Sequence, residues 1–153
     1  MSLINCLLYI VISGVLVFFI GRVFPRKLIK ENAFPFKSFS FEKEGKIYDK
    51  IKIKSWKTKL PDASVIITKI LPNFMPVKRI KSNSKENIEI LVKESCVAES
   101  THVFAALLSL YCIKIAKKIG MYISLLYIFL NVPFILIQRY NRPRLKKLLK
   151  KYN

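Results

Sequence analysis

Two ionisable residues in an apolar setting, Glu99 and the single histidine His102, have the types and spacing for catalysis. They lie three residues apart in the mostly apolar run 95–113, and residues i and i+3 share one face of a helix. Ionisable side chains at membrane depth are costly, which makes a functional site the default hypothesis. Because a carboxylate next to an imidazole orients the ring and raises its basicity, the pair predicts a general base that works near neutral pH.

Two other interpretations of this pair remain. Glu99 and His102 can form a buried hydrogen bond that holds helices together and does no chemistry. The Glu-x-x-His unit is also half of a di-iron carboxylate site, but the other half is missing and the chain has no second histidine. We therefore expect no bound metal or other cofactor.

A second group of polar residues accompanies the last apolar run. Pro133 frees a backbone carbonyl inside that run, and Asn131 can supply hydrogen bonds close to the break. The segment that follows holds spaced arginines among other polar residues, and planar guanidinium groups suit phosphate. The candidates for binding a substrate or an anionic donor are Asn131, Gln138, Arg139, Asn141, Arg142 and Arg144, together with Trp56 in the loop before the second run.

The elements that carry these residues are expected to be apolar helices. The runs 3–20, 95–113 and 119–138 each approach the roughly 20 residues that a helix needs to cross a hydrocarbon core. We therefore expect a mainly α, small integral membrane protein with about three spans in a single domain, 1–153. Because Glu99 and His102 shorten the apolar part of the second run, that run suits a re-entrant or tilted segment as well.

The basic residues predict the orientation in the membrane. Of the 28 Lys and Arg, 18 lie in the loop 21–94, 7 lie in the tail 139–153, and 3 lie between the second and third runs. Cytoplasmic segments are enriched in Lys and Arg, so the N-terminus should face outward, with the loop and the tail in the cytoplasm. No basic residue precedes the first run and no small-residue cleavage site ends it, which favours a retained anchor over a signal peptide.

The net charge of +19 suits nucleic acid or anionic lipid. The cations flank apolar spans and alternate with Ile and Phe, which does not resemble a nucleic-acid-binding module. Membrane lipids are the simpler partner, at about 1 kcal/mol for each Lys or Arg near an anionic surface. An anionic acyl donor would be drawn to the same side.

The loop 21–94 is expected to hold short interfacial segments. A helix is predicted over 41–50, and the alternation of Lys and Ile over 50–57 favours a strand or an interfacial segment. Trp56 would then lie at the level of the lipid headgroups. Prolines leave 58–80 as loop, with at most a short element at 64–71.

A long helix should carry Glu99 and His102. Asn83 or Ser84 can cap it, and nothing breaks it before Gly120. Glu94 could support the site, although a surface ion pair with Lys93 or Lys85 is the simpler role. At 100° per residue one stripe faces the bundle interior, and Val97, Phe104 and Leu108 fall opposite, toward lipid. The stripe holds Ile88, Leu91, Val92, Ser95, Glu99, His102, Ala106 and Ser109.

Four segments, in matching order, resemble the glycosyl-4,4'-diaponeurosporenoate acyltransferases of staphyloxanthin biosynthesis. The resemblance runs from about Phe34 to Leu145, and its most specific part is the block Gln-Arg-Tyr-Asn-Arg-Pro-Arg over 138–144. The other segments are 36–45, Trp56-Lys57 leading to Leu60 and Asp62, and Glu94-Ser-x-x-Ala-Glu-x-x-His102. The Lys-, Ile- and Asn-rich composition is compatible with a low-GC bacterium, and the resemblance implies a bacterial cell membrane enzyme.

The resemblance implies esterification of a fatty acyl chain onto the primary hydroxyl of a glucose carried by a C30 carotenoid acid. The expected partners are a glycosylated lipid acceptor and acyl-CoA or another activated acyl donor. His102 would take the hydroxyl proton while Glu99 holds the imidazole, and Asn131, Gln138 or an arginine would stabilise the oxyanion. Two other classes stay open, namely a non-enzymatic membrane assembly or immunity protein and a membrane methyltransferase.

Overall fold

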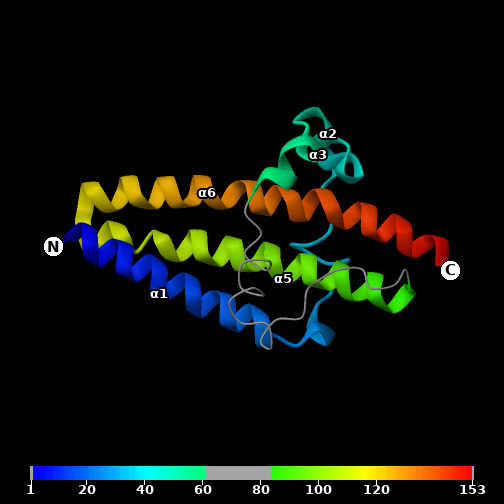
Figure 1. The fold of residues 1–153 in the computed structure, drawn as a ribbon, viewed down its shortest axis with the longest axis horizontal. Helices are drawn as coiled ribbons and strands as arrows, with labels where there is room; N and C mark the ends of the chain where they lie inside the picture. Colours follow the sequence, from blue (N-terminus) through cyan, green and yellow to red (C-terminus); the bar gives the residue numbers. More distant parts are fainter. Residues whose placement is uncertain (1, 61–83, 153) are drawn as a thin grey trace.

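Three long helices lie side by side in the computed structural model, which describes residues 2–60 and 84–152 (Figure 1). They are α1 (Ser2–Val23), α5 (Lys85–Ser109) and α6 (Cys112–Leu149). The remaining elements are single helical turns: η1 (Arg26–Leu28), η2 (Ser40–Gly45), α2 (Ile47–Lys50), α3 (Ile53–Trp56), η3 (Lys57–Lys59) and η4 (Lys150–Tyr152). The described part of the chain contains no strand, which confirms the mainly α class.

Two of the described helices, α1 and α6, are long and apolar enough to cross a membrane, and α5 is not one of them. The outer faces of α1 and α6 carry large apolar side chains such as Ile20, which is 61% exposed, and Phe129, which is 72% exposed. Extended apolar surface of this kind suits lipid contact. The expected span 95–113 covers the second half of α5 and the start of α6, and α5 packs against both α1 and α6.

The interfacial loop adopts helical turns where a strand was one of the expectations. Over 50–57 the chain forms the end of α2 and then α3, and Lys52 between them has a left-handed φ of 53°. The expected helix 41–50 is divided into the 3-10 turn η2 and the turn α2. The helical turns allow the side chains of Tyr48 and Ile53 to pack together against Tyr140 of α6. A flat alternating strand does not provide this arrangement. The expected element at 64–71 lies outside the described residues.

The hairpin between α5 and α6 differs from the expected unbroken helix that ends at Gly120. The Ser84 cap is confirmed, because its hydroxyl accepts a hydrogen bond from the Asn87 amide. The helix nevertheless ends at Ser109, and α6 starts at Cys112 with a kink at Ala116 and Lys117. The chain reverses at this kink, because Gly120 lies against Cys112 and Ser124 reaches the Ser109 carbonyl, and α6 continues as a helix well past 138. The reversal therefore lies in the turn between the second and third runs, three to four residues before the predicted end at Gly120.

Gly120 permits the reversal because its backbone lies very close to the backbone of Cys112. A Cβ at this position would lie 1.8 Å from the carbonyl oxygen of Cys112, so only glycine fits. The Ser124 hydroxyl contacts the Ser109 carbonyl at 2.6 Å, and the Tyr9 hydroxyl donates to the Leu108 carbonyl at 3.1 Å. These side chains add hydrogen bonds to carbonyls in the last turn of α5, where the regular helical pairing ends.

The interior contains two small apolar clusters and a set of buried polar side chains. Cys6, Ile10 and Cys112 pack at the end where the N-terminus and the hairpin lie, and the cluster of Tyr48, Ile53 and Tyr140 joins the basic loop to α6. The buried polar residues are Glu42, Ser95, Glu99, Ser109, Ser124, Asn131 and Arg142. All of them except Glu42, which lies in η2, belong to α5 and α6.

The predicted inward stripe of α5 is largely confirmed. Six of its members are buried, namely Ile88, Val92, Ser95, Glu99, Ala106 and Ser109, and His102 is half-buried. The opposite face differs from the expectation. Val97, Phe104 and Leu108 line a cavity beside α1, although Phe104 and Leu108 remain substantially exposed.

Candidate functional site

His102 on α5 is oriented by Asn131 on α6. The His102 Nδ1 atom lies 2.9 Å from the Asn131 Oδ1 atom, and the ring stacks on Phe134 with centroids 4.8 Å apart. The Asn131 Nδ2 atom donates to the Tyr127 carbonyl at 2.8 Å, which places the amide oxygen toward the imidazole. That oxygen can only accept, so Nδ1 carries the proton and Nε2 of the neutral ring has a free lone pair. This tautomer is the one that a general base requires.

Glu99 does not hold His102, contrary to the expected pairing. Its Oε1 atom lies 2.6 Å from Nη1 of Arg139, and its Oε2 atom accepts from Nη2 of Arg142. The two arginines are three residues apart on α6, so they share one helix face and each takes a different carboxylate oxygen. Charged hydrogen bonds of this kind are about twice as strong as neutral ones, which explains why the carboxylate prefers guanidinium to imidazole.

Arg139 uses all five of its N–H groups inside the protein. Its Nε and Nη2 atoms bind the Glu42 carboxylate at 2.5 Å and 3.1 Å. Its remaining contacts are with Glu99 and with the backbone carbonyls of Pro35 and Lys37, at 3.2 Å and 3.3 Å. A guanidinium has five N–H donors, so none remains for an external anion in this arrangement. Arg139 therefore fastens the segment around 35–42 to α5 and α6.

Arg142 has the same fastening role and is only 3% exposed. Its Nε atom donates to the Ser95 hydroxyl at 3.0 Å, and its Nη1 atom donates to the Phe36 carbonyl at 2.9 Å. Nη2 reaches both the Ser95 carbonyl and Glu99. The sequence suggested phosphate binding for Arg139 and Arg142, and the structure instead places both in a buried network.

Glu42 completes this network. It was not among the predicted site residues, although it lies in the segment 36–45 that contributes to the family resemblance. Its carboxylate accepts from Arg139, from the Tyr48 hydroxyl and from the Phe39 amide, the last at 2.7 Å. Burial alone would raise the pKa of Glu42, but these donors outweigh burial and hold the pKa below its usual value. The pKa of Tyr48 is raised, first by burial and then by the adjacent carboxylate. Every buried side-chain polar atom in the described residues has a partner.

Arg144 and Asn141 hold the basic loop on the outer side of α6. The Arg144 Nη2 atom lies 2.7 Å from Asp49, and its guanidinium lies 3.5 Å from the centroid of the Tyr140 ring. Asn141 accepts from the Lys57 ammonium at 3.0 Å. The pKa of Lys57 is lowered, mainly by burial and then by the Arg144 and Lys54 charges. Arg144 has a side chain that is 38% exposed, which makes it the most accessible of the three arginines.

The remaining candidates are dispersed. The Trp56 indole donates to the Ile51 carbonyl at 2.9 Å and packs on the cluster at Tyr140. Gln138 is half-buried. Glu94 pairs with Arg26 of η1 at 2.8 Å, a partner that the prediction from the sequence did not name. This pair connects η1 to α5 across 68 residues of sequence.

A cavity of about 410 Å³ opens beside the buried network. Its lining combines the charged residues Glu42, Glu99 and Arg139 with the aromatic rings of Phe39 and Tyr48. Pockets of this size hold small ligands, and a few polar groups within an apolar wall fix the orientation of the ligand. His102 lies one helical turn beyond Glu99, on the same inward face of α5.

Comparison with known proteins identifies the family. The sequence profile of the glycosyl-4,4'-diaponeurosporenoate acyltransferases matches residues 31–151. Proteins of that name from Staphylococcus aureus strains MRSA252, N315 and USA300 are each 31% identical over 147 residues, covering 95% of this chain and 86% of theirs. No solved structure matches. The chain therefore belongs to the glycosyl-4,4'-diaponeurosporenoate acyltransferase family and is an acyltransferase enzyme.

Proposed function

We propose that this protein esterifies a fatty acyl chain onto a sugar hydroxyl of a glycosylated lipid, with His102 as the general base. The observation that carries the proposal is the Asn131 amide, which accepts from Nδ1 of His102 while donating to the Tyr127 carbonyl. The names of the relatives supply the acceptor, a glycosyl-4,4'-diaponeurosporenoate in carotenoid biosynthesis. Family membership as an acyltransferase displaces the non-enzymatic and methyltransferase alternatives.

The chemistry is direct transfer. Nε2 of His102 takes the proton of the sugar hydroxyl as its oxygen attacks the acyl carbonyl. When the tetrahedral intermediate collapses, the bond from carbon to the leaving group breaks, and the imidazolium returns the proton to that group. For acyl-CoA the leaving group is a thiolate that departs as the thiol. Asn131 maintains the ring orientation in both steps, as the orienting amide does in Cys-His-Asn proteases.

Glu99, Arg139 and Arg142 are positioning residues in this proposal. They hold the segment around 35–42 against the facing surfaces of α5 and α6, and so they shape the 410 Å³ cavity that would receive the sugar. A half-buried amide, Gln138, is the candidate donor to the oxyanion. Arg144 and neighbouring lysines would attract the phosphates of an anionic donor, because Arg144 retains an exposed guanidinium.

The packing of the helices supports the proposed membrane placement. The helix α5 contacts both α1 and α6, so a bilayer around those two apolar helices also surrounds the half of α5 that carries His102. The N-terminus and the α5–α6 reversal lie at one end of the molecule, and the C-terminus lies at the other (Figure 1). The proposed topology puts the first end outside a bacterial cell membrane, with the basic loop and tail in the cytoplasm.

Mass spectrometry of the lipid product tests the proposed function. Purified protein in lipid nanodiscs receives a glucosylated lipid and an acyl-CoA, and the expected product gains the mass of the acyl group and loses it on mild alkaline hydrolysis. A control reaction replaces the sugar lipid with its aglycone, which should remain unmodified. An unchanged glycolipid, or an added methyl group with a methyl donor present, would overturn the proposal.

A further inference from the structure

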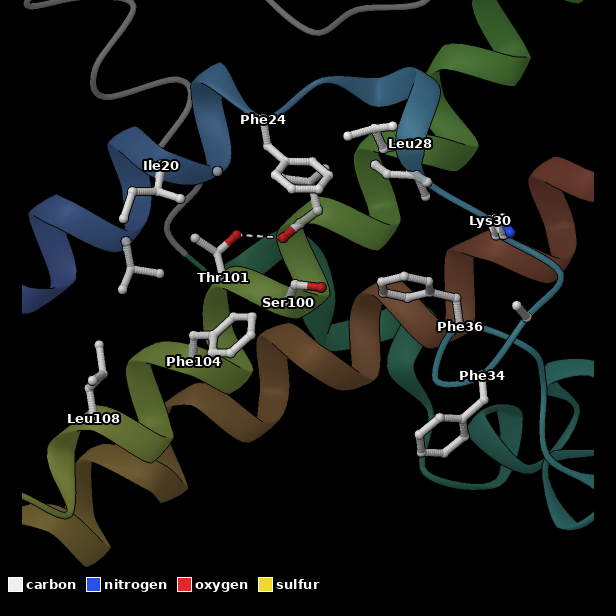
Figure 2. A pocket seen from close by; sticks show the side chains of 15 residues that line it. Ile20, Phe24, Leu28, Lys30, Phe34, Phe36, Ser100, Thr101, Phe104 and Leu108 are labelled. Carbon is white, nitrogen blue, oxygen red and sulfur yellow. Dashed lines mark hydrogen bonds between the residues drawn. The ribbon is translucent and has the colours of Figure 1, made fainter.

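An elongated cavity of about 590 Å³ lies between α1, α5 and the segment 24–36, on the side of α5 away from Asn131. Its walls are almost wholly apolar. Figure 2 shows Ile20 and Leu108 toward one end and Lys30, Phe34 and Phe36 toward the other, with Phe24 and Phe104 between them. The long direction of the cavity therefore follows the two helices.

The polar groups of this cavity gather away from its Leu108 end. Lys30 is exposed at the lip of the cavity. Ser100 adds a hydroxyl to the wall, whereas the Thr101 hydroxyl is occupied by the Val97 carbonyl at 2.5 Å. An apolar channel with a cation at one mouth is complementary to a single hydrocarbon chain that carries an anionic group at one end.

The cationic end of the cavity also borders the buried ionic network. Phe36 lines the cavity, its ring lies 5.4 Å from the Arg142 guanidinium, and its carbonyl accepts from Arg142. Ser100, another lining residue, directly follows Glu99. The chain cavity and the charged cavity are thus separated by the short segment that Arg139 and Arg142 fasten.

We propose that this cavity binds the hydrocarbon chain of the acyl donor, with the chain end toward Val17 and Leu108 and the activated carboxyl end toward Lys30. The assignment rests on the proposed function, and it adds the site that selects chain length. Each buried methylene strengthens binding by about fourfold, so an apolar wall discriminates between chains that differ by a few carbons. Leu108 lines the end of the cavity away from Lys30 (Figure 2).

Chain-length selection tests this inference. We expect Leu108→Trp to shift the best substrate in a series of saturated acyl-CoA donors toward shorter chains, because the larger ring fills the end of the cavity away from Lys30. Leu107→Trp is the matched control, since Leu107 is 55% exposed on the same helix and does not line the cavity. Lys30→Gln should raise KM for the anionic donor and leave kcat unchanged. A chain-length profile that both tryptophan variants leave unaltered would overturn the assignment.

Direct labelling separates this inference from the proposed function. A photoreactive fatty acid with its diazirine near the methyl end is bound to the wild-type protein, irradiated and mapped by peptide mass spectrometry. Crosslinks to 17–24 on α1 and 97–108 on α5 are expected, and they should fall at least tenfold in Leu108→Trp. They would support the chain site even if no glycolipid were acylated. Crosslinks confined to the outer face of α6 around Phe129 would overturn it.

Discussion

At the scale of single residues, the orientation of His102 by an uncharged amide is the arrangement on which the proposed mechanism depends. Asn131 fixes the protonated nitrogen as Nδ1 because its own NH2 is engaged with the Tyr127 carbonyl. Phe134 restrains the ring plane by stacking. These contacts come from two helices, so the geometry of the base is set by the packing of α5 on α6.

We expect Asn131→Leu to lower kcat/KM by about 10²-fold, because the imidazole loses the acceptor that selects its tautomer. Asn131→Asp keeps an oxygen acceptor for Nδ1–H and should retain more of the rate than the leucine variant. Steady-state kinetics with a fixed glycolipid measure both. Equal rates for the leucine variant and wild type would remove Asn131 from the mechanism.

Glu99 should contribute to the stability of the folded protein and take no direct part in the reaction. Glu99→Gln leaves Arg139 and Arg142 without their shared carboxylate, and breaking a buried ion pair costs about 3–5 kcal/mol. Thermal unfolding in detergent should therefore show a large decrease in the stability of the Glu99 variant. Glu44→Gln is the control, because that carboxylate is 74% exposed and 3.7 Å from Lys147, and its loss should change little. A Glu99 variant that unfolds like wild type but has lost turnover would show that Glu99 takes part in the reaction.

At the scale of elements, the tight α5–α6 reversal sets the register in which Asn131 faces His102. We expect Gly120→Ala to destabilise the protein by about 1–3 kcal/mol or more, because the added methyl would overlap the Cys112 carbonyl. In Gly14→Ala the new methyl would meet only the Tyr127 hydroxyl at 3.3 Å, the end of a side chain, so its effect should be smaller. Unfolding curves of the two variants make the comparison, and equal stability would show that the reversal relaxes easily.

The helices and the inward face of α5 could be predicted from the sequence because hydrophobic periodicity is a local property. The exact position of the reversal, at Ala116 and Lys117, depends on Gly120 fitting against Cys112 and on Ser124 reaching the Ser109 carbonyl, and local periodicity does not specify these contacts. Over 50–57, alternation favoured a strand or an interfacial segment, and the chain forms helical turns that pack on Tyr140.

The sequence also predicted several residues of the candidate site, but it did not predict which of them contact one another. Glu99 and His102 are neighbours on one helix, which suggested a pair. Their actual partners lie 29 to 43 residues away on α6, and spacing along one helix contains no information about them. Glu42 shows the same limit, because its contact with Arg139 spans 97 residues.

At the scale of the whole molecule, the two termini lie at opposite ends of the long axis, and α2 and α3 lie nearer the C-terminal end (Figure 1). This is the arrangement expected when the basic regions face the cytoplasm.

Thiol labelling in intact cells measures this topology. Ser2→Cys should react with a membrane-impermeant maleimide, and Lys151→Cys should react only after permeabilisation. Both positions are exposed, whereas the native cysteines Cys6, Cys96 and Cys112 are buried and should give little background. The reverse labelling pattern would invert the proposed orientation.

The most direct test of the central claim is the turnover of His102→Gln in nanodiscs with a glucosylated lipid and acyl-CoA. The glutamine side chain is close to histidine in size but provides no base at the Nε2 position, so kcat should fall by about 10²- to 10⁴-fold while the thermal unfolding midpoint stays near that of wild type. Wild-type turnover in this variant, measured as acylated glycolipid, would contradict the account.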